Sequence, residues 1–207
     1  MPDFLKATVE TLKIAILSGF FALILGILLA SVYQLKTKPL NFLINLYTSI
    51  VRGTPLLVQL YFVYYGLSNI GIMVDSYTGA IAAFTFNTGA YMAEIFRGGL
   101  EGIDKGQFNA AYSLGMSWTA CLRNIIFPQV LQRIISPLLT QLAYLIKDTS
   151  LAAVLVIREL TYTYRHLASN TYRSFEALVP PMIIYFGLYV IFRLASICFA
   201  AKKGGKA

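Results

Sequence analysis

Residues 14–35 read IAILSGFFALILGILLASVYQL, a run of 22 residues without a charged side chain. At a rise of about 1.5 Å per residue, a helix of about 20 apolar residues crosses the hydrocarbon core of a bilayer. The run is too long for the apolar part of a cleaved signal peptide, which is usually about 7–15 residues. It therefore predicts a membrane-spanning helix over about residues 10–35.

The composition of the whole chain agrees with a bilayer environment. Of its 207 residues, 57% are hydrophobic and only 13% are charged, and the mean hydropathy is +0.67. In soluble domains, roughly 45–50% of the residues are apolar and roughly 25% are charged. These values exclude an ordinary water-soluble fold, and the length fits a single transmembrane domain over residues 1–207. The net charge of +8 indicates no nucleic-acid partner, because the basic residues are scattered between apolar runs.

Four more spans follow from the later apolar runs. They are expected at about residues 55–74, 76–96, 128–148 and 177–201. Thr54 and Pro55 are expected as the cap and the first helical position of the second span, because proline lacks only an N–H that has no partner there. Residues 40–51 precede it as a kinked extension or an interfacial helix. The predicted fold class is an all-α polytopic membrane protein with five transmembrane helices.

Lysine and arginine near the span ends orient the chain, since cytoplasmic loops carry an excess of them. The segments after the first, third and fifth spans are rich in these residues, whereas residues 69–77 contain none. We therefore expect the N-terminus outside and the C-terminus in the cytoplasm. Arg158, Arg165 and Arg173, in an outer segment by this count, oppose the rule.

Residues 98–127 are too polar to cross lipid. Apolar residues nevertheless recur in this loop at helical spacing: Leu114, Trp118, Leu122 and Ile125. The pattern predicts two short amphipathic helices with a break at Gly115. Such a helix pair either rests on the membrane interface or docks a soluble partner.

A spaced motif lies within the same loop. It consists of Asn109-Ala110-Ala111, then Gly115 after three residues, then Ile125-Ile126-Phe127-Pro128 after nine. The motif resembles the EAA loop of importer permeases of the ATP-binding cassette (ABC) superfamily. This sequence departs from the family pattern at Asn109, where the family has Glu, and at Phe127, where Leu is common. The first departure bears on any ionic contact made by that carboxylate.

Four further stretches are similar to the polar amino-acid branch of that family. They are residues 52–59 (RGTPLLVQ), 90–99 (AYMAEIFRGG), 105–107 (KGQ) and 147–151 (KDTSL). The resemblance implies a type I importer permease in a bacterial cytoplasmic (inner) membrane, paired with a second permease subunit that is itself or a close relative. Two cytoplasmic ATPase subunits and an extracytoplasmic amino-acid-binding protein would complete the importer.

The resemblance also implies a role for the loop. In the family the EAA loop forms the coupling helix, which lies in a groove of the ATPase. The corresponding residues are Asn109, Ala110, Ala111, Gly115 and Trp118. The two alanines would allow close backbone approach, Gly115 a sharp reversal and Trp118 an apolar anchor. The chain has no Gly-x-x-x-x-Gly-Lys-Ser/Thr phosphate loop. We therefore expect ATP and Mg to be used by the partner ATPase, with no cofactor and no enzymatic activity in this chain.

Lys147 and Asp148 are adjacent charges between two apolar runs. Burial of charge in lipid costs a few kcal/mol, and adjacent helical residues point about 100° apart, so the pair cannot neutralise itself well. A broken helix that lines a polar cavity would accommodate it. A zwitterionic amino acid offers its α-carboxylate to Lys147 and its α-ammonium to Asp148. In the amino-acid branch these positions, with Thr149 and Ser150, correspond to substrate contacts in members that have a membrane site. Otherwise the pair caps the outer end of the span.

Glu94 has two interpretations. Three residues before Arg97, it fits an ordinary ion pair at the inner end of the third span. The resemblance implies instead a contact to a cationic substrate side chain, although Glu94 is expected to lie nearer the cytoplasm than Lys147.

Two other functions stay open from the sequence. One is a scaffold permease subunit without a substrate site of its own. The other is a membrane-embedded enzyme that uses Glu94, Asp148 and His166 as acid–base groups, although no two of them have motif-like spacing.

Overall fold

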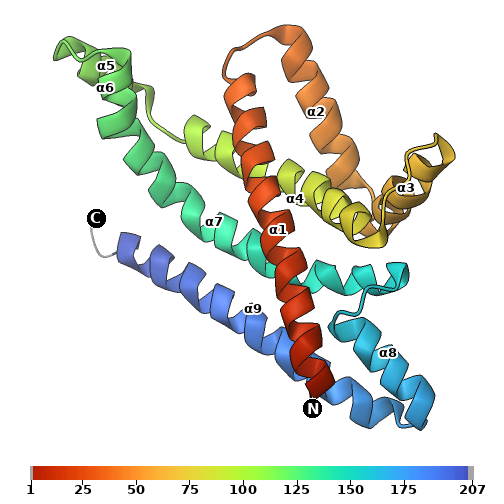
Figure 1. Cartoon of the computed structure of the whole chain (residues 1–207). Coiled ribbons are helices and arrows are strands. Elements are labelled where there is room, and N and C mark those ends of the chain that lie inside the picture. Colours follow the sequence, from red (N-terminus) through yellow and green to blue (C-terminus); the bar gives the residue numbers. More distant parts are fainter. Residues whose placement is uncertain (1, 205–207) are drawn as a thin grey trace.

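The chain folds into α-helices joined by short turns (Figure 1). The computed structural model describes residues 2–204. The α-helices are α1 (Pro2–Tyr33), α2 (Lys38–Gly53), α3 (Leu56–Asn69), α4 (Ser76–Glu101), α5 (Lys105–Ser113), α6 (Trp118–Cys121), α7 (Phe127–Asp148), α8 (Leu160–Thr171) and α9 (Ser174–Gly204). A π-helical turn (Leu122–Ile126) joins α6 to α7, and a 3₁₀ helix (Thr149–Leu155) follows α7. The all-α prediction is confirmed.

Within residues 2–204, three helical segments are long and apolar enough to cross a membrane: Asp3–Tyr33, Trp118–Leu155 and Ser174–Phe199. Trp118–Leu155 contains the predicted fourth span, and the other two overlap the predicted first and fifth spans, which extend two residues further. The predicted second span, residues 55–74, falls on α3, which is shorter, and the helix expected before it over residues 40–51 is α2. The predicted third span falls on α4. Helix α4 continues to Glu101, beyond the predicted end at residue 96.

The chain bends between α2 and α3. Helix α3 begins at Leu56, one residue later than expected, because Pro55 keeps an extended backbone and takes the cap position. Thr54 is correspondingly not the N-cap of α3; it ends α2, and its hydroxyl donates to the carbonyl of Ile50 at 2.8 Å.

One side chain closes this bend. The Gln59 amide nitrogen donates to the carbonyl oxygens of Val51 at 2.7 Å and Thr54 at 3.1 Å. The Gln59 amide oxygen accepts from the amide of Asn87, at 3.0 Å, on the neighbouring helix α4. Carbonyl groups freed by a helix break need partners within the protein when no water reaches them, so Gln59 both satisfies the break and fixes it to α4.

Helices α1 and α4 pack closely because each has a glycine at the point where the other helix approaches it. A Cβ atom on Gly26 would lie 2.7 Å from Cβ of Met92, and one on Gly89 would lie 2.7 Å from Cδ2 of Leu25. Only hydrogen fits at these positions, as in many helix pairs of membrane proteins. The main buried cluster lies beside this contact and consists of Ile14, Leu60, Ala80, Ala83, Phe84, Leu145, Ala152, Leu155 and Ile157.

The functional candidates occupy separated parts of the molecule. Helices α5 and α6 form a knob at one end, whereas the N-terminus and α8 lie toward the opposite end (Figure 1). Helix α7 connects the knob to the 3₁₀ helix that carries Thr149 and Ser150.

Candidate functional site

The predicted helix pair in the loop is present, with its break at Gly115. Helix α5 is capped by Asp104, whose carboxylate accepts from the backbone N–H of Gly106 at 2.7 Å. Gly115 has a φ of +74°, a left-handed conformation that glycine adopts without steric cost. Ser117 then caps α6 by accepting from the N–H of Ala120.

The knob presents apolar side chains to its surroundings. Leu114 is 81% exposed and Trp118 is 54% exposed. The Trp118 ring stacks on Phe108 of α5, with 5.9 Å between ring centroids, which holds the indole in place. Exposed aromatic anchors on a rigid support are typical of protein interfaces.

The coupling residues divide into exposed and buried ones. Asn109 and Ala110 are exposed, whereas Ala111 is fully buried. Ala111 therefore shapes the knob from within and gives no surface to a partner in this conformation.

The knob is joined firmly to the membrane helices. Its buried cluster includes Ile103 after α4 and Val130 and Ile134 of α7, together with Ala111, Cys121 and Ile126. The π-helical turn that leads into α7 places Ile126 in this cluster. Movement of the knob would therefore be transmitted directly to α7.

Lys147 and Asp148 lie where α7 ends and the backbone becomes 3₁₀-helical. The sequence predicted a broken helix at this pair. The α winding does end there, but the helix is not interrupted, because it continues in 3₁₀ form to Leu155 and the chain turns away at Val156, whose φ is +63°. The Lys147 ammonium lies 4.5 Å from the ring centroid of Tyr144 and 4.8 Å from that of Tyr189 on α9. These rings stabilise the cation through their negative faces.

The carboxylate of Asp148 has a different environment. Its side chain is half-buried, and no salt bridge to it occurs among residues 2–204. Thr149 is buried and its hydroxyl donates to the carbonyl of Ile146 at 2.7 Å, while Ser150 is half-buried. Lys147, Asp148 and Ser150 are accessible and give the candidate site a cationic and an anionic group, whereas Thr149 is fully buried and supports the site from inside.

Glu94 belongs to a separate cluster on α4. Its carboxylate pairs with Arg97 at 2.6 Å, as the ion-pair interpretation expects, and also with Arg52 of α2 at 3.2 Å. Arg97 also pairs with Glu101 at 3.1 Å. In this conformation Glu94 is therefore neutralised by two arginines.

Helix geometry keeps Glu94 apart from Lys147. The Arg133 guanidinium of α7 donates to the carbonyl of Gly102, after α4, so these two positions are level. Glu94 lies about 12 Å along α4 from that level, and Lys147 about 21 Å along α7. As expected, Glu94 is the nearer of the two to the knob.

Sequence reasoning missed the role of Glu159. This buried carboxylate caps α8 by accepting from the N–H groups of Thr161 and Tyr162, and it accepts from the hydroxyl of Tyr185 of α9 at 2.5 Å. The next residue, Leu160, donates its N–H to the hydroxyl of Thr11 of α1. Glutamate is not a preferred cap residue, so the sequence carried little signal for this anchor.

The groups proposed for an enzyme lie on different elements. Glu94 is on α4, Asp148 ends α7, and His166 is exposed on α8, where it stacks on Tyr162. Within the described residues, no three His, Cys, Asp or Glu side chains gather as a metal-binding group.

Comparisons with known proteins agree with this geometry. Residues 22–201 match the family described as binding-protein-dependent transport system inner membrane component. The chain is 37% identical to the probable amino-acid ABC transporter permease protein PatM of Vibrio harveyi, over 98% of this chain and 92% of that protein. It is 33% identical to the arginine transport system permease protein ArtQ of Bacillus subtilis (strain 168), over 92% and 88%.

Solved structures give the same result. A crystal structure of an amino acid ABC transporter with histidines superposes with a TM-score of 0.90 at 32% identity, over 97% of this chain and 94% of the other. An inward-facing MetNI methionine ABC transporter shares the fold, with a TM-score of 0.75 at 16% identity, over 97% and 96%. ATP is used by the partner ATPase of such systems, and a binding protein is a further partner. The chain therefore belongs to the family of inner-membrane components of binding-protein-dependent transport systems, as the multi-pass permease subunit of an ABC importer.

Proposed function

We propose that the cargo of this permease is a polar amino acid. The relatives named above are amino-acid permeases, and another relative, 39% identical over 72% of this chain and 64% of its own length, is the L-cystine transport system permease protein TcyB of Bacillus subtilis (strain 168). The observation that carries the proposal is the pair of opposite charges where α7 changes to a 3₁₀ helix. An amino acid has the complementary pair.

The substrate site consists of Lys147, Asp148, Thr149 and Ser150. Lys147 binds the α-carboxylate, and Asp148, which has no salt-bridge partner within residues 2–204, binds the α-ammonium.

Glu94 provides a second contact, to a cationic side chain of the substrate. Because Arg52 and Arg97 already pair with it, such a side chain reaches Glu94 only when the Arg52 ion pair opens. Neutral side chains would leave that pair closed.

The chain crosses the membrane five times, through α1, α2–α3, α4, α7 and α9. An odd number of crossings places the termini on opposite sides, and the Lys and Arg distribution places the N-terminus outside. The knob of α5 and α6 is then cytoplasmic.

Two copies of this permease, or this chain and a close relative, assemble with two ATPase subunits. The ATPase contacts the knob through Asn109, Ala110, Gly115 and Trp118, while Ala111 supports it from inside. Closure of the ATPases moves the knob, and the buried cluster shared with α7 carries this movement to the site at Lys147.

A scaffold role without a substrate site is the alternative. The observation in its favour is that the Lys147 ammonium already lies against two tyrosine rings. Substitution of Asp148 distinguishes a scaffold role from substrate binding, because only substrate binding requires its charge.

The test is Asp148→Asn in vesicles that contain the assembled transporter. Loss of one charge-assisted hydrogen bond costs about 1.5–3 kcal/mol, so half-maximal uptake should require roughly ten- to hundredfold more amino acid. Asp3→Asn, which neutralises an exposed carboxylate of α1, is the matched control and should leave uptake unchanged. Identical curves for wild type and Asp148→Asn, at equal incorporation, would support the scaffold role.

A further inference from the structure

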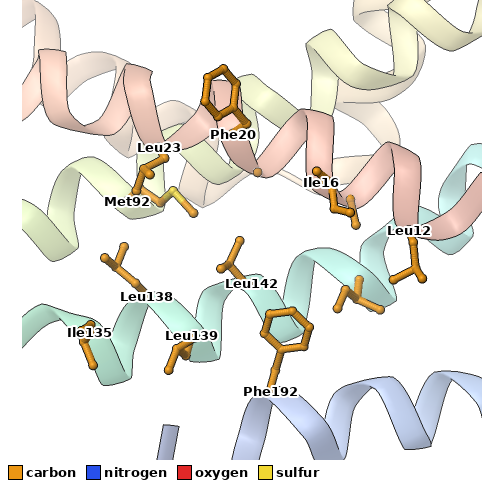
Figure 2. A pocket seen from close by; sticks show the side chains of 13 residues that line it. Leu12, Ile16, Phe20, Leu23, Met92, Ile135, Leu138, Leu139, Leu142 and Phe192 are labelled. Carbon is orange, nitrogen blue, oxygen red and sulfur yellow. The ribbon is translucent and has the colours of Figure 1, made fainter. Parts of the chain in front are cut away.

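An apolar groove lies between α1, α7 and α9 and encloses about 390 Å³ (Figure 2). Its lining contains no side chain with nitrogen or oxygen: Leu12, Ala15, Ile16, Gly19, Phe20, Leu23, Met92, Ile135, Leu138, Leu139, Leu142, Ile146 and Phe192. An apolar cavity of about 150 Å³ stays dry and accepts benzene. This larger space is therefore suited to hydrocarbon and not to water.

The groove follows from how the helices pair. Helix α1 packs mainly on α4, and α9 packs mainly on α7, so α1 and α9 diverge on the two sides of α7. Gly19 of α1 lets this helix approach α7 closely, since a Cβ atom on it would lie 3.1 Å from Cδ2 of Leu142. In Figure 2 the side chains of Leu138 and Leu142 point toward α1, and Phe192 reaches toward α7 from α9.

The dimensions of the groove fit one extended chain. Its lining covers residues 12–23 of α1 and 135–146 of α7, each about 16 Å long by helical rise. This is about half of a hydrocarbon core of about 30 Å, and so the depth of one leaflet.

The groove is narrower than a helix of another subunit. A volume of 390 Å³ open to the centres of water-sized molecules, over about 16 Å of length, gives a channel about 8 Å wide once about 1.4 Å is added on each side, whereas a helix with side chains needs about 10–12 Å. Carbon atoms make contact at about 4 Å, so a single methylene chain fits.

Basic residues lie near both ends of the groove: Arg133 precedes Ile135 by two residues at one end, and lysines lie at the other. Leu12 and Ile146 lie at the same end, and each is followed directly by a lysine, Lys13 and Lys147. The Lys13 side chain is 55% exposed and pairs with Glu10. The side of the groove is open where Ile16 and Phe20 are 67% and 58% exposed on a membrane-spanning helix. A phosphate headgroup at the Lys13 end would place its acyl chain along the groove.

We propose that this groove is a binding site for one acyl chain of a membrane phospholipid, with the lipid phosphate near Lys13. The site is formed by the membrane-spanning helices alone, so it does not depend on which solute the permease carries. The lipid fills the space that would otherwise separate α1 from α9 and thereby supports α7, the helix that links the knob to Lys147.

The test uses the permease assembled with its ATPase subunits in vesicles of phosphatidylethanolamine and phosphatidylglycerol. A small fraction of the phosphatidylglycerol carries a photoreactive diazirine in the middle of an acyl chain, and the labelled peptides are identified by mass spectrometry. Labelling should concentrate on the groove residues of α1 and α7 and stay low on Leu28, an equally lipid-exposed position of α1 outside the groove.

Leu139→Trp fills the groove and should lower labelling of the α1 groove residues about tenfold, since it removes the contacts of roughly two methylene groups. Leu131→Trp, on an exposed part of α7 outside the lining, is the matched control and should label as wild type. If Leu139→Trp does not fold, Ala15→Leu fills the same space from α1. Even labelling of all exposed apolar positions, or unchanged labelling in the filled variants, would overturn the proposal.

Discussion

Single polar side chains fix the irregular points of this membrane protein. Gln59 supplies partners at the bend between α2 and α3, and Glu159 supplies them at the start of α8. Both residues use one side chain to satisfy two backbone groups and to contact another helix. An unsatisfied backbone group in a water-poor interior costs several kcal/mol, so such residues determine where a break can occur.

Asp75 is a comparable residue at the surface. As the N-cap of α4, its carboxylate accepts from the N–H groups of Tyr77 and Thr78 and from the Thr78 hydroxyl. These hydrogen bonds, that of the Thr78 hydroxyl above all, lower the pKa of Asp75. Because the folded-state pKa lies below the unfolded value of about 3.9, the cap stabilises fully above that value and loses its effect as pH falls through the folded-state pKa.

The lowered pKa of Asp75 predicts how the stability lost in Asp75→Ala changes with pH. The melting temperature of the purified variant should lie below that of wild type at pH 6, and the difference should shrink as the pH is lowered below about 4. Circular dichroism melts in detergent measure it, with Asp3→Ala as an exposed-carboxylate control. A difference that stays constant down to the lowest pH would show that the carboxylate charge contributes nothing to the cap.

The two short helices α5 and α6 depend on the turn at Gly115. A side chain at its φ of +74° costs about 1–2 kcal/mol, least for Asn. No heavy atom lies within 4 Å of a Cβ built at this position. Substitution therefore acts through the backbone and not through a clash.

Gly115→Leu should accordingly leave the membrane helices inserted but reduce transport per ATP hydrolysed, because the angle between α5 and α6 changes. Gly115→Asn, which tolerates the same conformation, should retain most of the coupling. The measurement is the ratio of uptake to ATP hydrolysis in vesicles. Normal coupling in Gly115→Leu would contradict the role of the knob as the coupling element.

The sequence predicted regular elements well and their irregular joints less well. Apolar runs without charge located α1, α7 and α9, and Gly115 located the turn of the knob, because length and positive φ have strong sequence signals. The π-helical turn before α7 and the anchor at Glu159 arise from long-range packing and hydrogen bonds. At Lys147 and Asp148 the winding changes from α to 3₁₀, but the helix continues to Leu155, so the predicted interruption at the pair is not present.

Glu94 illustrates the limit for site residues. Its pair with Arg97 follows from a spacing of three residues, but its second partner, Arg52, lies on another helix, more than forty positions earlier. Local spacing therefore predicted the pair with Arg97, whereas the pair with Arg52 depends on how α2 and α4 pack.

At the scale of the whole molecule, the five-span arrangement predicts which surfaces face each side of the membrane. In a variant with Cys198→Ser, a cysteine at Asp75 should react with a membrane-impermeant maleimide from outside intact cells. A cysteine at Tyr112, exposed on α5, should react only after the membrane is opened. Reaction of both positions from the same side would contradict the arrangement.

An amino acid is proposed to bind this chain where α7 changes to a 3₁₀ helix, while ATPases act on the knob at the other end. Electron cryo-microscopy of the assembled importer with its amino acid would reveal the ligand at this position. We expect ligand density with the α-carboxylate within hydrogen-bonding distance of Lys147 and the α-ammonium within that distance of Asp148. No ligand density beside these residues, in a complex whose binding protein is occupied, would refute this site.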